Sequence, residues 1–375
     1  MRSFTLLVTF PLLLSLVAGI LDAHQRKRKK KGEVEEITQT LEVPKDPPHA
    51  VPAEPQRLGF YTAPMSVKGL LSQQVRDGLK ALRSQVHGAS IIKIRALVAG
   101  TGDLRRVQAI VSEQFTEWRM PIPALTTIQV GALPQEGSQV LLEAITMEKK
   151  TIHPHGLVFL SGQQVTAKEA LEKVEPLFKE SLARLRTVLQ GLNIAPADML
   201  RTTCFVSALG DHAQLRAILA AQFPKAAHTI VQTLRGLTSG LVECEGVARA
   251  SSAPASPLQA LNPKGLAASP NYSQAVAVNA PKIILSGSQQ AFHTQDADVK
   301  LAFERLRRDL EQSGANLRNT VMTNYYPLTQ ATIDKIRKVR FEFLDKTRPP
   351  ASTMLLFEGL PSKDASFAVE VITLP

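Results

Sequence analysis

Apolar residues along the chain form the same helical pattern three times. In each set they recur at intervals of four, three and four residues, which places them on one face of an α-helix. A glycine follows each set closely, as is typical of a helix C-terminus. The sets are Val75, Leu79, Leu82 and Val86 before Gly88; Phe178, Leu182, Leu185 and Leu189 before Gly191; and Val299, Phe303, Leu306 and Leu310 before Gly314.

Each predicted helix is followed by a β-rich segment and then by a second helix. The β-rich segments are 91–99, 200–206 and 320–326. The second helices carry paired apolar residues, namely Val111 and Phe115, Leu219 and Phe223, and Val339 and Phe343. The three units start roughly a hundred residues apart, too far for a solenoid repeat and suitable for a whole small domain. The sequence therefore predicts three tandem copies of one α+β domain.

Two stretches of alternating apolar and polar residues precede the third helix. Residues 275–278 and 283–285 flank a turn that contains proline, a pattern that predicts a β-hairpin. The second stretch ends in Ser286-Gly287, where glycine permits a sharp turn or the close approach of a ligand. The passage from Tyr272 to Gly287 resembles the opening of the Rid family of reactive intermediate deaminases, also called L-PSP endoribonuclease-like proteins.

This resemblance implies a definite architecture. Rid proteins are α+β domains with a six-stranded sheet backed by two helices, similar to the chorismate-mutase-like fold, and they form trimers with clefts between neighbouring subunits. Three copies in one chain can satisfy all of these contacts internally. We therefore expect three chorismate-mutase-like domains that form a single-chain pseudo-trimer, and a monomer in solution.

Composition suggests where the domains begin and end. Five prolines within 44–55 exclude a central strand, and we expect this stretch to connect two strands of an irregular hairpin, 36–43 and 58–63. The expected segments are a signal peptide or anchor at 1–23, a basic segment at 24–32, domains at 33–149 and 150–250, a Pro/Ser/Ala linker at 251–258, and a third domain at 259–375.

The N-terminal segment points to the secretory pathway. An apolar run at 4–21 lies behind Arg2 and before a possible cleavage point at Ala23, as in a signal peptide. Six basic residues at 26–31 favour the alternative, an uncleaved membrane anchor with the body left in the cytoplasm. Because the apolar run is short for a membrane span of about 20 residues, we favour export to the periplasm or the exterior.

Those six cations account for much of the net charge. Removing them from the formal charge of +11 leaves +5 for the rest of the chain. A nucleic-acid surface should instead be clustered on the folded part, so we expect no nucleic-acid partner. The basic segment is better explained as a solvated tail that can contact anionic lipid.

The general motifs offer little chemistry. Cys204 and Cys244, the two cysteines of the chain, could form a disulfide in an exported protein or remain buried thiols. His153 and His155 have no nearby third ligand, so we expect no metal site. No glycine-rich phosphate loop is present, and we expect no cofactor.

The resemblance also implies a catalytic apparatus, from which this chain departs. In Rid proteins an Arg that follows Pro-Ala holds the substrate carboxylate, and a Glu in the last strand helps to position water. Here Leu125, His228 and Ser352 stand where that Arg belongs. Only the second domain keeps both acids of the last strand, Glu243 and Glu245. Leu141 with Glu143 and Ala368 with Glu370 replace them in the other domains, and we expect the second Glu of each copy to be structural.

One composite site is the best candidate. If a cleft combines residues of two neighbouring domains, Tyr272 of the third could face His228 and Glu243 of the second. Ser286 or Ser161 would add a hydroxyl group at the edge of a cleft. His228 and Glu243 are then the catalytic candidates. Protonated His228 could also bind an anion.

Two functions follow from these departures. The first is a Rid-like protein with degenerate deaminase sites that binds a small carboxylate, an enamine or imine, or a protein partner at an interdomain cleft. The alternative is an active enamine/imine deaminase of the 2-iminobutanoate/2-iminopropanoate type with a different residue set. Because none of the three copies keeps the Arg, we favour the first.

Overall fold

The computed structural model describes residues 44–100, 102–169, 173–237 and 239–375. The expected signal peptide or anchor, the basic segment and the strand at 36–43 lie outside the described residues. Within the described ranges, no helix has the length and apolar character needed to cross a membrane.

The three repeats have the predicted order of elements, and residues from Pro44 onward form one compact unit. The first repeat consists of β2 (Leu58–Thr62), α2 (Leu71–Gln85), β3 (Ser90–Ala99), α3 (Leu104–Glu117), β4 (Ala124–Val130) and β5 (Val140–Met147). The second consists of β6 (Leu157–Thr166), α4 (Glu175–Gly191), β7 (Met199–Val206), α5 (His212–Gln222), β8 (Ala227–Gln232) and β9 (Leu241–Arg249).

The third repeat consists of β12 (Ile283–Ser286), β13 (Gln289–Phe292), α6 (Asp296–Glu311), β14 (Thr320–Pro327), α7 (Gln330–Val339), β15 (Ala351–Met354) and β16 (Ala365–Thr373). Three further strands precede the first and third repeats: β1 (Ala50–Ala53), β10 (Leu258–Leu261) and β11 (Ala275–Val278). Short 3₁₀ turns lie at Pro55–Arg57, Pro196–Asp198, Leu317–Asn319 and Arg340–Glu342.

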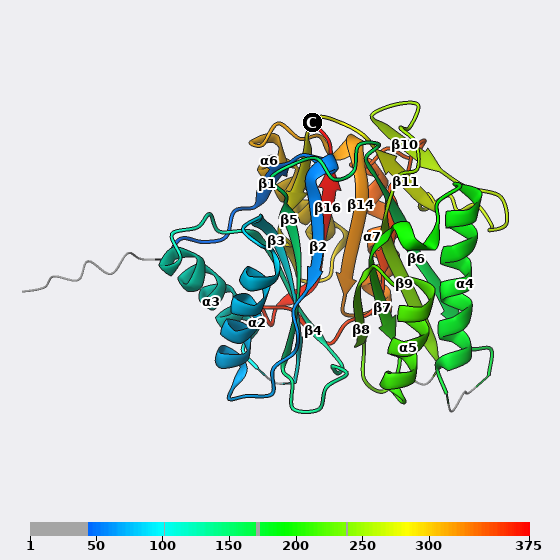
Figure 1. Cartoon of the computed structure of the whole chain (residues 1–375). Helices are drawn as coiled ribbons and strands as arrows, with labels where there is room; N and C mark the ends of the chain where they lie inside the picture. Colours follow the sequence, from blue (N-terminus) through cyan, green and yellow to red (C-terminus); the bar gives the residue numbers. More distant parts are fainter. Residues whose placement is uncertain (1–43, 101, 170–172, 238) are drawn as a thin grey trace, which may run out of the picture. The chain divides into compact units, whose positions relative to one another are not determined.

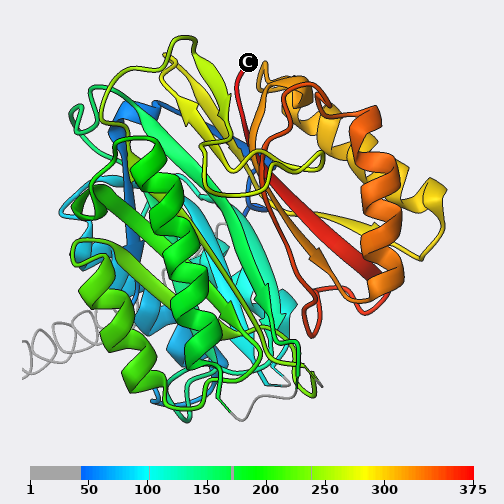
Figure 2. The same cartoon turned by 90° about the vertical axis from the view of Figure 1, so that its right-hand side faces the viewer.

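Each repeat builds its sheet in the same way. The last strand pairs antiparallel with the strands before and after the first helix, and the strand after the second helix joins in parallel at the edge. Two helices cover one face, α2 and α3 on the first sheet and α4 and α5 on the second (Figure 1). Helices α6 and α7 cover the third, at the right of Figure 2. The predicted α+β class with three similar domains is confirmed.

The predicted amphipathic helices form because their apolar faces are buried against these sheets. Val75, Leu79 and Leu82 of α2 are fully buried, as are the matching residues of α4 and α6. The helix-free faces of the three sheets pack together in two further apolar clusters. One of these joins Leu58, Phe159 and Leu285, one residue from each repeat.

Strands β1 and β11, which we call leading strands, precede the first and third repeats but pair with strands of other repeats. Here the sequence-based expectation was wrong. Strand β11 does not form a hairpin with β12 but pairs antiparallel with β6 of the second repeat. Strand β12 instead pairs with β1, which lies within the stretch expected to be a simple connection. Alternation identifies a strand without identifying its partner. The turn between β11 and β12 is held by the first repeat, where Gln56 donates to Asn279 and to the carbonyl group of Ala280.

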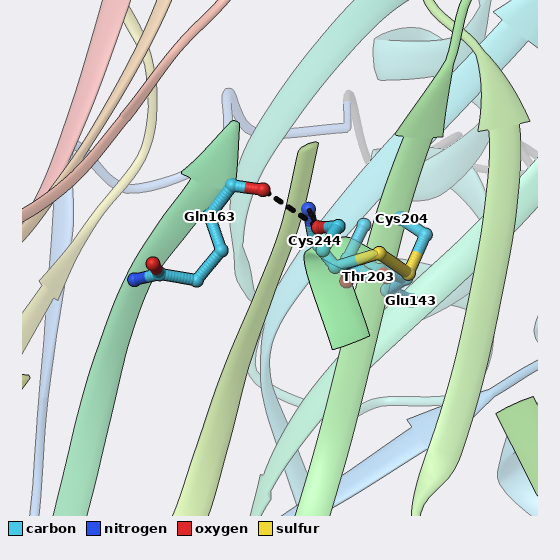
Figure 3. Close-up of a disulfide and its surroundings, with 6 residues drawn as sticks. Glu143, Gln163, Thr203, Cys204 and Cys244 are labelled. Atoms are coloured by element: carbon cyan, nitrogen blue, oxygen red, sulfur yellow. Dashed lines mark hydrogen bonds between the residues drawn. A yellow bond between two sulfur atoms is a disulfide. The ribbon is translucent and has the colours of Figure 1, made fainter. Parts of the chain in front are cut away.

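The two cysteines lie directly opposite each other on β7 and β9, and the structure joins them in a disulfide (Figure 3). Both residues are fully buried in the helix-side core of the second repeat. Of the two states that the sequence left open, the structure therefore contains the disulfide.

Candidate ligand cleft

Three junctions between repeats are candidates for a Rid-type cleft. At each junction, the strand before the first helix of one repeat approaches the parallel edge strand of another: β2 meets β8, β6 meets β15, and β12 meets β4. The parallel registers place Leu125, His228 and Ser352 opposite Ile94, Thr202 and Thr323, which are equivalent positions in the three repeats. The alignment made on the Pro-Ala segments therefore holds in three dimensions.

The junction between the first and second repeats is open. It contains a cleft of about 650 Å³, within the range of roughly 300–1,000 Å³ found for ligand pockets. Segment 60–65 forms one wall, and β8 with the end of α5 forms the other. The lining includes three basic residues, Arg216, Lys225 and His228, and no acidic residue. The apolar part of the lining comprises Phe60, Ala63, Pro64, Met65, Pro134, Leu141, Ala220, Ala226, Ala227 and Ile230.

The imidazole of His228 is mostly uncharged near pH 7. Burial lowers the pKa of its imidazole, and nearby Arg216 lowers it further, while the backbone carbonyl group of Phe223 opposes these effects. Its Nδ1 atom is buried and has no hydrogen-bond partner among the described residues. The positive charge of the cleft therefore comes from Arg216 and Lys225, which are both exposed.

Among the described residues, the junction between the second and third repeats is closely packed around Ser161 and Glu243, and we call it the closed junction. Ser161 is fully buried there, where its hydroxyl group donates to the carbonyl of Ser273 at 2.6 Å and accepts from the backbone N–H of Ser352 at 2.8 Å. A Cβ atom on Gly162 would lie 1.9 Å from Oε1 of Glu243, so only glycine leaves room for that carboxyl group. Ser161 therefore ties two backbones together and does not face a ligand.

Glu243 and Tyr272 both lie at this closed junction. Burial and the charge of Glu245 raise the pKa of Glu243 to about 8, and Gln164 donates to its carboxyl group at 3.1 Å. Tyr272 is half-buried, and burial followed by the charge of Glu243 raises the pKa of its phenol. Glu243 is therefore a neutral, buried acid near pH 7.

The predicted composite site is thus divided between two junctions. The structure brings Ser161, Glu243 and Tyr272 together, but it places His228 on the opposite side of the second repeat, against the first. In the second repeat, the edge strand β8 with His228 faces the first repeat, whereas Glu243 of β9 faces the third repeat. The sequence does not reveal this circular order, so the proposed meeting of Tyr272 with His228 was wrong.

The remaining junction, between the third and first repeats, contains a smaller cleft of about 320 Å³. Ser286 lies beside it, but its hydroxyl group accepts from the backbone N–H of Val371 at 2.8 Å, and its carbonyl group accepts from Lys93 at 2.6 Å. Leu125 lines the cleft where a Rid protein would carry Arg. Ser286 is therefore a structural residue in this fold.

The second acids of the last strands meet in a buried ionic cluster where the three sheets come together. Arg95 donates to Glu143 at 2.6 Å and to Glu245 at 3.1 Å, and its guanidinium group lies 3.8 Å from Glu370. Lys93 pairs with Glu370 at 2.5 Å. Burial alone would raise the pKa of Glu370, but Lys93 and Arg95 lower it to about 2. These acids are structural, as expected from the sequence.

The two histidines considered as metal ligands have different surroundings. His153 is buried, with its Nε2 atom 2.9 Å from the carbonyl oxygen of Leu58 and its Nδ1 atom accepting from Arg249 at 3.2 Å. His155 lies in the exposed turn that follows. In the part of the chain that the structure describes, no three His, Cys, Asp or Glu side chains are grouped so that they could hold a metal ion.

Sequence reasoning missed the residues that give the open cleft its charge. Arg216 and Lys225 lie on and just after α5, and an exposed cation near a helix carries no distinguishing signal. The ionic cluster could have been recognised, because Lys93 and Arg95 interrupt an otherwise apolar strand, β3. Charged residues in such a strand are seldom buried unless they are paired.

Comparison with known proteins finds similarity to several solved structures. No protein-family model and no curated protein matches this chain. Among solved structures, a Rid-family protein of unknown function from Yersinia pestis is 17% identical, with a TM-score of 0.28, and the match covers 32% of this chain and 100% of that one. A YjgF/YER057c/UK114-family member from Mycobacterium tuberculosis is 22% identical, with a TM-score of 0.24, over 28% and 86% of the two chains.

A putative L-PSP endoribonuclease from Entamoeba histolytica gives a similar result. It is 21% identical, with a TM-score of 0.23, over 32% of this chain and 99% of that one. All three are described as members of the Rid, YjgF or L-PSP families, at low identity and with each match covering about a third of this chain. They concern the fold and do not extend to an activity.

Proposed function

We propose that this Rid-like chain binds a small organic anion in the cleft between its first and second repeats, and that its deaminase sites are degenerate. The observation that carries the proposal is the lining of that cleft, which combines Arg216, Lys225 and His228 with apolar walls and includes no acidic residue. A carboxylate with an apolar body is the ligand class that such a lining favours.

The basic residues and the apolar wall have separate roles. The guanidinium group of Arg216 can bind a carboxylate through two parallel hydrogen bonds, and Lys225 adds a compact positive charge. Phe60, Met65 and Leu141 offer apolar surface for the rest of the ligand. Neutral His228 can donate or accept one hydrogen bond.

The distribution of acids supports degeneracy. In the open cleft, the position equivalent to Glu243 is Leu141, so no carboxylate is available there to orient a water molecule. The junction that keeps Glu243 is closed, and the acid is neutral near pH 7. Space and the water-positioning acid are therefore in different junctions, and hydrolysis of an enamine or imine needs them together.

Calorimetric titration with benzoate and 2-oxobutanoate tests this proposal. Arg216→Ala and Lys225→Ala should each weaken binding by about tenfold or more, because each removes a charged hydrogen bond to the carboxylate. Both residues are exposed, so the variants should fold. Arg186→Ala is the matched control, since Arg186 is an exposed cation of α4 that contacts Gln222 and does not line the cleft. Affinity that is unchanged in both cleft variants would rule out this site.

A further inference from the structure

In two of the three repeats, a leading strand from elsewhere in the chain pairs with the edge of the sheet before the first helix, and we call it a guest strand. Strand β11 lies antiparallel on β6, with Val276 opposite Phe159. Strand β1 lies antiparallel on β12, with Val51 opposite Leu285. On their inner sides, Phe159 and Leu285 face Val247 and Ile372, each two residues after the structural Glu of its last strand. The two guest strands therefore occupy equivalent places.

The equivalent residue in the first repeat is Phe60. It faces Ile145, which lies two residues after Glu143. Among the described residues, β2 pairs with β5 alone and ends its sheet. The position that a guest strand fills in the other two sheets is therefore an open edge in the described part of this one.

The backbone of β2 presents hydrogen-bonding groups along that edge. The backbone N–H of Ala63 donates to the carbonyl oxygen of Leu142, and the backbone N–H of Glu148 donates to the carbonyl oxygen of Arg57. The odd-numbered residues of this strand therefore form hydrogen bonds with β5. In an antiparallel ladder the residues between them point their N–H and C=O groups the other way. These are Leu58, Phe60 and Thr62, of which Leu58 already has its carbonyl oxygen contacted by His153.

The order of strands along the chain explains the open edge. The first and third repeats are each preceded by a leading strand, β1 and β11, and each of these is used by a different repeat. The second repeat has no leading strand, because only residues 148–156 connect β5 to β6. Within the described residues, three equivalent edges thus share two leading strands.

We infer that the edge of β2 binds an extended peptide segment of a partner protein, antiparallel and in the register of the two internal guest strands, in place of the hairpin with 36–43 that we expected there from the sequence. The inference shares its cleft with the proposed function but stands on strand geometry. Backbone hydrogen bonds would give such a complex affinity, and alternate side chains would give it specificity. Exposed strand edges readily pair in this way.

The internal guests and the lining of the cleft define the sequence of the peptide. The guests read Ala275-Val276-Ala277 and Ala50-Val51-Pro52, a valine between two small residues. Segment 60–62 of β2 also lines the cleft that contains Arg216 and Lys225 and includes no acidic residue. The guest strands therefore indicate an Ala-Val-Ala core for the peptide. The basic lining of the cleft favours acidic residues on either side of that core.

Fluorescence anisotropy with the labelled peptide Asp-Ala-Val-Ala-Asp, acetylated at its N-terminus, tests the inference on the full chain. The valine opposite Phe60 should donate its N–H to β2, because the register and the bond from Ser161 N–H to the carbonyl group of Gln274 turn the N–H of Val276 towards β6. N-methylation of that valine should weaken binding at least tenfold, whereas N-methylation of either alanine, whose N–H faces away, should leave it within about twofold. The three methylated peptides carry the same added methyl group and differ in which edge of the peptide it blocks.

A charge exchange provides the protein-side test. Arg216→Glu should weaken the acidic peptide and strengthen a peptide with lysine in place of both aspartates. Equal loss of binding for the valine-methylated and the alanine-methylated peptides, or no binding of the unmethylated one, would overturn the inference. If benzoate binds and the peptide does not, strand addition fails and the proposed function stands. If the peptide binds with the expected methylation pattern and small carboxylates do not, the reverse holds.

Discussion

Replacing Glu243 with glutamine removes a carboxyl group that the fold holds in its neutral form. The residue is buried at the closed junction, where Gln164 donates to it and Gly162 packs against it. Burial and Glu245 raise its pKa from 4.5 to about 8. Glutamine has nearly the same shape as the protonated acid and cannot ionise, so the substitution isolates the effect of the charge.

The sign of the effect follows from the raised pKa. Between pH 4.5 and pH 8 the folded chain keeps a proton on Glu243 that the unfolded chain releases. The contribution of this group to stability is fully present below pH 4.5 and is lost as pH rises towards 8, at up to about 1.4 kcal/mol per pH unit. Over the whole interval the loss approaches about 5 kcal/mol, a ceiling because buried groups relax when they ionise.

Guanidinium chloride unfolding from about pH 5 to about pH 9 measures this effect. The wild type and Glu243→Gln should have similar stability near pH 5, and the variant should become the more stable of the two by several kcal/mol near pH 8. Glu136→Gln serves as the control, because Glu136 is exposed. Parallel stability curves for the wild type and Glu243→Gln would refute the neutral, buried state of this acid.

One substitution, one binding titration, one activity assay and one sedimentation measurement give further predictions. Arg95→Met leaves three buried glutamates without their shared partner and should lower the free energy of unfolding by about 3–5 kcal/mol in urea titrations, whereas a loss below about 1 kcal/mol would contradict the cluster. Benzoate affinity should be flat between about pH 7 and pH 8 and rise only at lower pH, because the pKa of His228 lies below its ordinary 6.5; a rise that begins at neutrality would contradict this. Hydrolysis of the enamino acid formed from serine should stay near background, since the open cleft has Leu141 in place of the water-positioning acid; turnover abolished by His228→Ala would instead support the deaminase alternative. The chain should sediment as a monomer, because its repeats satisfy one another's contacts, and a trimer of chains would contradict the pseudo-trimer.

Local pattern was enough to predict the main helices and the strands that follow them. The apolar faces of α2, α4 and α6 could be read from the sequence because a buried helix face has a fixed period. The equivalence of Leu125, His228 and Ser352 was also correct, because it depends on position within a repeat. Strand exchange was missed, since the alternation in β11 is the same whichever strand it joins.

The candidate site failed for a similar reason. Whether His228 meets Glu243 depends on the circular order of the repeats, which no local pattern encodes. Arg216 and Lys225 were overlooked because their importance comes only from the wall that β2 builds opposite them. The sequence identified residues that had changed from the Rid pattern, and the structure was needed to show which junctions contain a cleft and how large each cleft is.

A crystal structure of the chain soaked with benzoate is the most direct measurement of the central claim. The account predicts density for the ligand between segment 60–65 and β8, with its carboxylate at Arg216 or Lys225. Benzoate bound beside Glu243 at the closed junction, or beside Leu125 in the smaller cleft while the larger one stays without ligand, would contradict it.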